Sequence, residues 1–205
     1  MNTKLADSKG KIVREAATLL YFGVEKEFKQ AKVKAAKTFG SHFLPKNLEV
    51  ALELDRIAEE TEGPARKERL AQMREEALNI MEPLEGCNPI LIGSVWRGTI
   101  RPGSDIDIAL YHDTPSEIVN LLKANGFEVA KTEWTSVTKK GKNESAFHIY
   151  GATEGKHEIE IVVRSLEETS RKRKCEIFGD EIKGLSRHEL EKLLRDNPTR
   201  KFIPL

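Results

Sequence analysis

The sequence predicts an α+β fold, in which a mixed β-sheet flanked by helices follows an all-helical region. Two observations support this prediction. Apolar residues recur at helical spacing through roughly the first 85 residues. After Pro89 they alternate with polar residues in short segments, a pattern typical of strands. We therefore expect a helical N-terminal region over residues 1–85 and a sheet-containing domain over residues 86–205.

Three helices are expected in the N-terminal region. A continuous apolar series from Ala16 to Phe39 predicts the first, with Gly23 as a candidate kink. Asn47 can cap the second helix through its side-chain oxygen. The third is expected to begin at Pro64, because proline suits the first turn of a helix.

In the second region, strands and helices are separated by polar turns. Two helices are expected there, each starting with a capping box, formed by Thr114 with Glu117 and by Ser186 with Glu189. The predicted strands are PILIG, DIDIALY, FEVAKTEWTSV, SAFHIYGA and HEIEIVVRS. This mixture of segments predicts a sheet covered by helices.

The composition excludes several classes of protein. The 205 residues carry a net charge of +1 with 33% charged residues. The overall charge therefore gives no indication of binding to nucleic acid or membranes. No apolar run approaches the ~20 residues of a membrane span. The N-terminus lacks an apolar signal core, which predicts a cytoplasmic protein. Cys87 and Cys175 are isolated, which favours two reduced thiols over a disulfide.

Two aspartates interrupt the apolar strand DIDIALY. Asp105 and Asp107 alternate with Ile106 and Ile108, so both carboxylates point to the same face of the predicted strand. Two like charges side by side repel each other, and a cation between them would resolve this conflict. Oxygen ligands without histidine or cysteine favour Mg²⁺ or Mn²⁺ over zinc. A third carboxylate is available in HEIEIVV, where Glu158 and Glu160 also share a face.

A Gly-Ser pair directly follows the strand PILI. Glycine lets the backbone approach a phosphate closely, and the hydroxyl of Ser94 can donate to an anionic oxygen. The amides of the next turn can donate as well, and Arg97 and Arg101 add positive charge nearby. A phosphate-binding loop beside a metal site is suited to phosphoryl or nucleotidyl transfer by a two-metal mechanism.

Each part of this pattern also has an ordinary explanation. A Gly-Ser pair alone is a common turn, and SDID alone can be a solvated edge strand. The combination is more specific: a strand, Gly-Ser, the spacer 95–104, Asp-x-Asp in a second strand and a later acidic strand. We therefore interpret the segment as a functional site.

The segment GSVWRGTIRPGSDIDIALY resembles the signature of the nucleotidyltransferase superfamily of DNA polymerase beta. It is most similar to the catalytic head of archaeal CCA-adding enzymes, and FHIYGATEGKHEIEIVV parallels a later block of those enzymes. The likeness covers about Pro89 to Arg164. It implies a nucleotidyltransferase palm, and it leaves the helical N-terminal region and the acceptor open, because too few residues follow Arg164 for the body and tail domains of those enzymes.

The resemblance assigns a role to each motif residue. Asp105, Asp107 and Glu160 would be the catalytic, metal-binding carboxylates, with Glu158 as the alternative third ligand. Glu160, or Asp107, could also help to deprotonate the attacking hydroxyl. The residues expected to bind the nucleotide are Gly93, Ser94, Arg97 and Ser104. His148 is either a nucleotide contact or a hydrogen-bonded residue of the sheet.

The predicted activity is metal-dependent transfer of a nucleoside monophosphate from an NTP to an acceptor hydroxyl, with release of pyrophosphate. ATP is the first choice of nucleotide and an RNA end the first choice of acceptor, with a protein hydroxyl (AMP transfer) second. A catalytically silent nucleotide- or RNA-binding protein on the same fold is the alternative. The basic segments Lys26–Lys46, Lys139–Lys142 and Arg171–Lys174 are either solvated faces or a phosphate-binding track. Trp96 and Trp134 are too few to predict a stacking platform.

Overall fold

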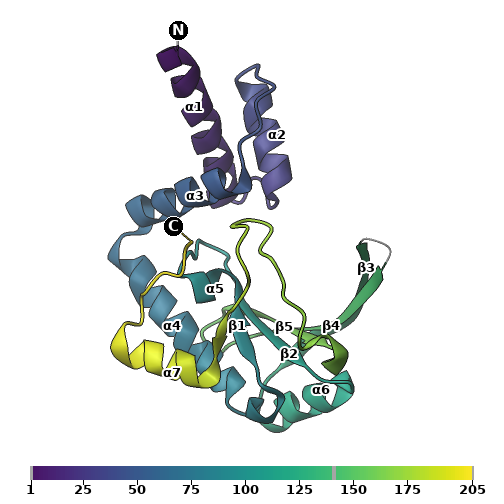
Figure 1. The fold of residues 1–205 in the computed structure, drawn as a ribbon. Helices are drawn as coiled ribbons and strands as arrows, with labels where there is room; N and C mark the ends of the chain where they lie inside the picture. The colour runs from purple at the N-terminus through teal and green to yellow at the C-terminus, as the bar shows by residue number, and fades with distance from the viewer. Residues whose placement is uncertain (1, 140–141, 205) are drawn as a thin grey trace. The chain divides into compact units, whose positions relative to one another are not determined.

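The structure is a computed structural model that describes residues 2–139 and 142–204 (Figure 1). Side chains are described from residue 8 onward, except those of residues 137–143 and 205. The helices are α1 (Asn2–Tyr21), α2 (Phe28–Thr38), α3 (Asn47–Glu62), α4 (Pro64–Met81), α5 (Gly93–Arg97), α6 (Pro115–Ala124) and α7 (Arg187–Asp196). The strands are β1 (Ile90–Ile92), β2 (Ile106–Tyr111), β3 (Val129–Lys139), β4 (Lys142–Ala152), β5 (Glu158–Arg164) and β6 (Leu185–Ser186). Within this part of the chain, no helix is long and apolar enough to cross a membrane.

The chain divides into two compact units, one over residues 1–66, 174–181 and 204–205 and the other over residues 67–173 and 182–203. Each unit has its own apolar core, and the two cores share no residue. Helix α4 contributes its buried apolar residues to the core of the second unit, whereas the sequence places this helix in the N-terminal region. The predicted boundary between a helical region over residues 1–85 and a nucleotide-transferring domain over residues 86–205 stays a prediction.

Helices α1, α2 and α3 form the first unit. Its core combines apolar residues of all three helices: Ile12, Ala16, Ala17, Leu20, Tyr21, Ala31, Ala35, Ala36, Val50, Leu54, Ile57 and Ala58. The predicted continuous helix is two helices, because Gly23 adopts a left-handed φ of 67° and the chain turns between Tyr21 and Phe28. Near the end of this unit, the buried Arg66 pairs with Asp55 at 2.5 Å and with Glu59 at 2.7 Å.

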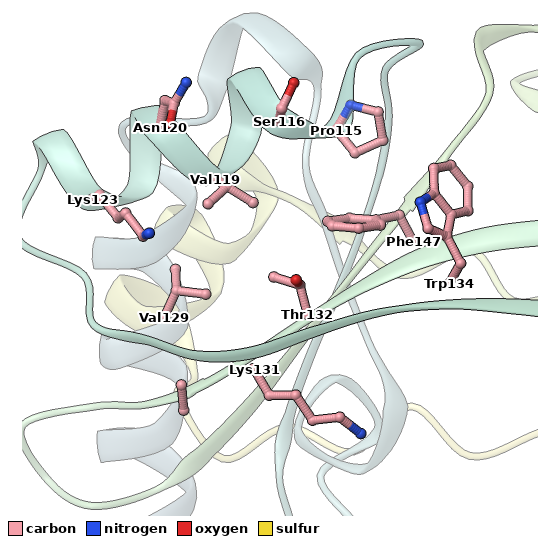
Figure 2. Close-up of a pocket in the computed structure, with 11 residues that line it drawn as sticks. Pro115, Ser116, Val119, Asn120, Lys123, Val129, Lys131, Thr132, Trp134 and Phe147 are labelled. Atoms are coloured by element: carbon pink, nitrogen blue, oxygen red, sulfur yellow. The ribbon is translucent and has the colours of Figure 1, made fainter.

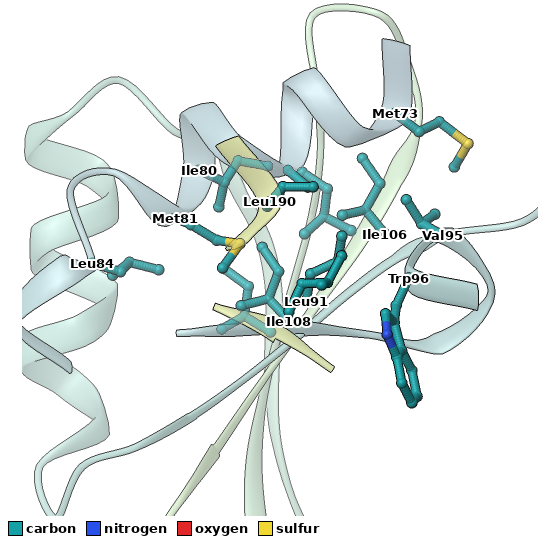
Figure 3. Close-up of a cluster of buried hydrophobic side chains, with 14 of the residues drawn as sticks. Met73, Ile80, Met81, Leu84, Leu91, Val95, Trp96, Ile106, Ile108 and Leu190 are labelled. Atoms are coloured by element: carbon teal, nitrogen blue, oxygen red, sulfur yellow. The ribbon is translucent and has the colours of Figure 1, made fainter. Parts of the chain in front are cut away.

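The second unit is built on a six-stranded sheet in the order β3-β4-β5-β2-β1-β6. Strands β2 and β5 are parallel and the other neighbours are antiparallel, so the predicted mixed sheet is confirmed. Apolar residues on one face of the sheet pack with residues of α4, α6 and α7, as the cluster in Figure 3 shows around Ile106 and Ile108. The alternate residues of β2 and β5, which include Asp107 and Glu160, point to the opposite face.

The predicted helix caps have mixed outcomes. The capping box of Ser186 and Glu189 is confirmed at the start of α7. Thr114 lies at the N-cap of α6 without a side-chain cap hydrogen bond, so that prediction is wrong. Lys46 is the N-cap of α3 and Asn47 is its first residue, so the prediction that Asn47 caps this helix is wrong. The Oδ1 of Asn47 instead accepts a hydrogen bond from the Lys32 ammonium at 2.7 Å. Pro64 begins α4 as predicted.

Candidate active site

Three carboxylates from two neighbouring strands meet on the face opposite the core. In the parallel ladder of β2 and β5, Asp107 lies directly opposite Glu160, and Asp105 immediately precedes β2. Oxygen atoms of Asp105, Asp107 and Glu160 lie within 4.8 Å of one another, with all three residues half-buried. This is the group that the sequence predicts as metal ligands, and among the described residues it forms an oxygen-only set that fits Mg²⁺ or Mn²⁺.

The electrostatics of the three carboxylates also fit a cation. Burial raises the pKa of Asp107 to about 8, and the charges of Asp105 and Glu160 add to this effect. Burial also raises the pKa of Asp105, helped by Glu160 and Glu158 and opposed by Arg101. Carboxylates that are difficult to ionise together are stabilised in their charged form by a divalent cation.

Gly93 and Ser94 lie beside these carboxylates because β1 runs antiparallel to β2. Ile92 pairs with Asp107, so the chain reaches Gly93 next to the central aspartate. A Cβ atom built on Gly93 would lie 1.8 Å from Asp107 Oδ2, and the glycine has a left-handed φ of +71°. The hydroxyl of Ser94 is buried and has no hydrogen-bond partner within the described residues. A buried, unsatisfied hydroxyl beside a glycine cradle fits an anionic ligand.

A comparison with protein families identifies the domain that carries this site. The family model described as a nucleotidyltransferase domain matches residues 76–181, which is more than half of the chain and includes all three carboxylates. The chain belongs to the nucleotidyltransferase domain family. The α+β fold with a mixed sheet that the sequence predicts is the fold that the structure shows.

Solved structures give weaker likenesses. A cytoplasmic RNA terminal U-transferase is 16% identical over 57% of this chain and 34% of its own, with a TM-score of 0.33. The GLD-2/RNP-8 complex is 14% identical over 60% of this chain and 44% of its own, with a TM-score of 0.34. The non-canonical poly(A) polymerase complex GLD-2–GLD-3 is 14% identical over 59% of this chain and 41% of its own, also with a TM-score of 0.34. This chain thus spans less than half of each, and the low TM-scores carry no argument about substrate. Curated proteins give no match.

In this nucleotidyltransferase domain, the side chains of Arg97 and Ser104 form hydrogen bonds with backbone groups. The guanidinium of Arg97 donates to the carbonyl of Phe202 at 3.0 Å and stacks on Trp96, and the residue is 3% exposed. These contacts hold the guanidinium inside the chain, and the predicted role of Arg97 at the triphosphate stays a prediction. The hydroxyl of Ser104 accepts a hydrogen bond from the backbone N–H of Arg101 at 2.9 Å and orders the turn before Asp105.

A hydrogen-bonded network on strands β3 and β4 supports Glu160. His148 Nδ1 lies 2.6 Å from Glu160 Oε1, and its Nε2 lies 2.7 Å from the hydroxyl of Thr135. His148 is therefore a hydrogen-bonded residue of the sheet, one of its two predicted roles. Tyr150 stacks on His148 and donates to Glu133 at 2.9 Å. Burial and this bond raise the pKa of the Tyr150 phenol.

Of the two acidic residues on β5, only Glu160 belongs to the carboxylate group. Glu158 is exposed and Glu160 is half-buried. Sequence reasoning missed Thr135, Glu133 and Tyr150. The alternation of FEVAKTEWTSV and SAFHIYGA shows which residues share a face, but the register that pairs Glu133 with His148 is a property of the folded sheet.

The two tryptophans lie in different environments. Trp96 is 5% exposed and packs in the core, whereas Trp134 is 63% exposed. Trp134 meets Phe147 edge to face and lines a pocket of about 560 Å³ between α6 and β3 (Figure 2). Because Phe147 and His148 are consecutive in β4, this pocket opens on the face opposite the one that carries His148 and the carboxylates.

Proposed function

We propose that this protein is a metal-dependent nucleotidyltransferase that transfers a nucleoside monophosphate from an NTP to an acceptor hydroxyl. The observation that carries the proposal is the cluster of Asp105, Asp107 and Glu160 beside Gly93 and Ser94, within a nucleotidyltransferase domain. In this reaction the acceptor oxygen forms a bond to the α-phosphorus, and the bond to the bridging oxygen of the β-phosphate breaks. Pyrophosphate leaves, and the proton of the acceptor hydroxyl is released.

Each residue of the cluster has a defined part in this proposal. Asp105, Asp107 and Glu160 would hold Mg²⁺ or Mn²⁺, which supplies charge neutralisation for the triphosphate and a lower pKa for the attacking hydroxyl. The hydroxyl of Ser94 donates a hydrogen bond to a phosphate oxygen. Gly93 has no side chain, which leaves room for the phosphate beside Asp107. Glu160 accepts the proton of the acceptor hydroxyl, and His148 holds its carboxylate in place.

The finer assignments rest on sequence motifs. The similarity of GSVWRGTIRPGSDIDIALY to the head of archaeal CCA-adding enzymes supports ATP as the nucleotide and an RNA end as the acceptor. A protein hydroxyl that receives AMP is the second candidate acceptor. The predicted cytoplasmic location agrees with either acceptor. A silent binding protein is disfavoured because all three carboxylates and the Gly-Ser pair are present and close together.

The test is transfer of label from each α-³²P-labelled NTP in turn, with Mg²⁺ or Mn²⁺, to fractionated cellular RNA and protein. We expect a labelled RNA with ATP, and loss of the product in EDTA and in Asp105→Asn and Asp107→Asn. Glu191→Gln, which changes an exposed carboxylate on α7, is the matched control and should keep wild-type activity. Label that enters no acceptor with any nucleotide, although nucleotide binds, would establish the silent alternative.

A second comparison concerns the third carboxylate. Glu160→Gln is expected to lower transfer at least ~100-fold, because it removes both a metal ligand and the proposed base. Glu158→Gln should have a much smaller effect, because Glu158 is exposed and outside the carboxylate group. The reverse order of the two variants would assign the third ligand to Glu158.

A further inference from the structure

A small basic pocket lies at the edge of the sheet where β2 and β5 begin. Its volume is about 280 Å³, below the range of ~300–1,000 Å³ that is typical of pockets for whole small-molecule ligands. The residues that line it include Arg69, Arg101, Ser104, Lys156, His157 and Glu158. Four of these are basic side chains and one is acidic, so the pocket suits a single anionic group.

The basic side chains come from three separate segments. Arg69 is on α4, Arg101 is in the turn before β2, and Lys156 and His157 are in the turn between β4 and β5. These segments are far apart in the sequence, and the folded sheet edge brings them to one recess. Convergence of positive charge from independent elements is the arrangement expected for recognition of a phosphate.

The turn between β4 and β5 holds its two basic residues in fixed positions. The backbone N–H of Thr153 donates to the carbonyl of His157, and that of Lys156 donates to the carbonyl of Thr153, both at 2.9 Å. His157 Nδ1 lies 2.7 Å from Glu76 Oε2, with both side chains less than 20% exposed. Because Nδ1 faces Glu76, Nε2 is the ring nitrogen available to the pocket that His157 lines.

The position of the pocket relative to the carboxylates indicates which substrate it serves. Ser104 directly precedes Asp105, and Glu158 is two residues before Glu160, so the pocket adjoins the β5 side of the carboxylate group. Gly93 lies on the other side of Asp107, because β1 and β5 flank β2 on opposite sides. If Gly93 and Ser94 receive the triphosphate, the basic pocket is next to the acceptor.

We propose that this pocket binds a phosphate of the acceptor, namely the phosphodiester that precedes the reacting hydroxyl at the 3′ end of a nucleic acid strand. This inference rests on the proposed function. A strand always carries a phosphate one nucleotide from its terminal hydroxyl, whereas a protein hydroxyl has no phosphate beside it. The pocket therefore selects the end of a nucleic acid strand, rather than a protein hydroxyl, as the acceptor.

The first test is binding without turnover. The full chain is titrated into a fluorescein-labelled oligoadenylate with a free 3′ hydroxyl, in EDTA and without nucleotide, and anisotropy is read at several salt concentrations. Lys156→Asn is expected to weaken binding about 3- to 10-fold and to reduce the salt slope by about 0.7. His157→Gln is expected to weaken binding through the loss of a ring hydrogen bond to the phosphate. Asparagine suits position 156 because Lys156 has a left-handed φ of 64°. Lys192→Gln, on the exposed side of α7, is the charge-matched control and should match wild type.

The second test is steady-state transfer to the same oligonucleotide. Lys156→Asn is expected to raise the KM for the oligonucleotide while the KM for ATP and kcat stay near wild type. A raised KM for ATP alone would assign the pocket to the triphosphate and overturn the proposal. Label that enters a protein acceptor, with a KM unchanged in Lys156→Asn, would overturn it in favour of a protein hydroxyl.

The two proposals fail in different ways. Wild-type affinity and salt slope in both pocket variants, together with active transfer, would reject the pocket and leave the nucleotidyltransferase intact. Weakened binding in the pocket variants without transfer to any acceptor would reject the enzyme and leave the phosphate site intact.

Discussion

At the residue scale, the surroundings of Asp107 strongly oppose the ionisation of its carboxylate. Burial raises its pKa from 3.8 to about 8, and Asp105 and Glu160 contribute. The unfolded chain releases this proton near pH 4, and the folded metal-free protein releases it near pH 8. Between these two pH values the folded state therefore binds one proton more than the unfolded state. Because the folded state binds more protons in this window, the free energy of unfolding decreases as the pH rises through it, and it levels off above about pH 8.

The first prediction is that Asp107→Asn removes this pH dependence. In EDTA the variant should be more stable than wild type at pH 8–9. The gap should reach up to roughly 6 kcal/mol at about 1.36 kcal/mol per pKa unit, and it should close towards pH 4. Added Mg²⁺ should stabilise wild type and leave the variant unchanged. Urea unfolding at several pH values, with and without Mg²⁺, measures both effects. A gap that is constant with pH would show that Asp107 is ionised in the metal-free fold.

The second prediction concerns the space between Gly93 and Asp107. Gly93→Ala places a methyl group 1.8 Å from the present position of Asp107 Oδ2 and adds the strain of a left-handed φ. We expect a loss of stability of about 1–2 kcal/mol and a fall in transfer of at least ~100-fold, because the central carboxylate must move. Thermal unfolding and initial transfer rates provide the two measurements.

Gly126→Ala is the matched control for this variant. Gly126 also has a left-handed φ, of +81°, but a Cβ atom there would meet nothing within 4 Å. It should lose about 1–2 kcal/mol of stability from this strain alone, no more than Gly93→Ala loses, and it should keep its transfer activity. Equal losses of activity in both variants would mean that backbone strain, rather than contact with Asp107, explains the effect of Gly93→Ala.

At the element scale, alternation in the sequence predicts the strands that carry the site and the face to which each carboxylate points. It does not predict that Asp107 lies opposite Glu160, since the pairing register depends on the assembled sheet. For the same reason, the sequence does not predict that the guanidinium of Arg97 donates a hydrogen bond to the carbonyl of Phe202. The break at Gly23 was visible only as a candidate kink, because helical periodicity continues on both sides of it.

Helix α4 supports α5, the helix that begins at Gly93, through Arg74, which sequence reasoning also missed. Its side chain is fully buried and donates to the carbonyls of Val95 at 3.0 Å and Trp96 at 2.8 Å, both in α5. It also donates to the carbonyls of Pro198 at 2.6 Å and Arg200 at 2.9 Å. Burial lowers the pKa of Arg74 to about 10, so the side chain stays charged at neutral pH. This single residue joins α4, α5 and the C-terminal segment.

The third prediction is that Arg74→Met destabilises the protein by at least about 3 kcal/mol, because it leaves buried carbonyls without their charged donor. Arg195→Met, an exposed arginine of α7, should change stability by less than about 0.5 kcal/mol. Urea unfolding of both variants gives the comparison. A small effect of Arg74→Met would indicate that water replaces the guanidinium at these carbonyls.

At the scale of the whole molecule, the two cores are separate sets of residues. Leu20 is fully buried in the core of the first unit, and Leu110 is fully buried in that of the second. Replacement of a buried leucine by alanine typically costs ~2–5 kcal/mol. If each core stabilises its own unit, the two substitutions should act on different parts of the chain.

The fourth prediction follows from this separation and also tests the domain boundary. In Leu20→Ala, amide protection against hydrogen exchange should fall over residues 8–62 and stay unchanged in β1, β2 and β5, with Mg²⁺ binding retained. In Leu110→Ala the pattern should reverse.

Helix α4 decides between the boundary near residue 66 and the boundary predicted after residue 85. Its buried apolar residues belong to the second core, although the sequence places the helix in the N-terminal region. Loss of protection over residues 70–81 in Leu110→Ala would place this helix with the nucleotidyltransferase domain. Its loss in Leu20→Ala would restore the boundary predicted from the sequence, and equal losses in both variants would show that the chain unfolds as one cooperative body.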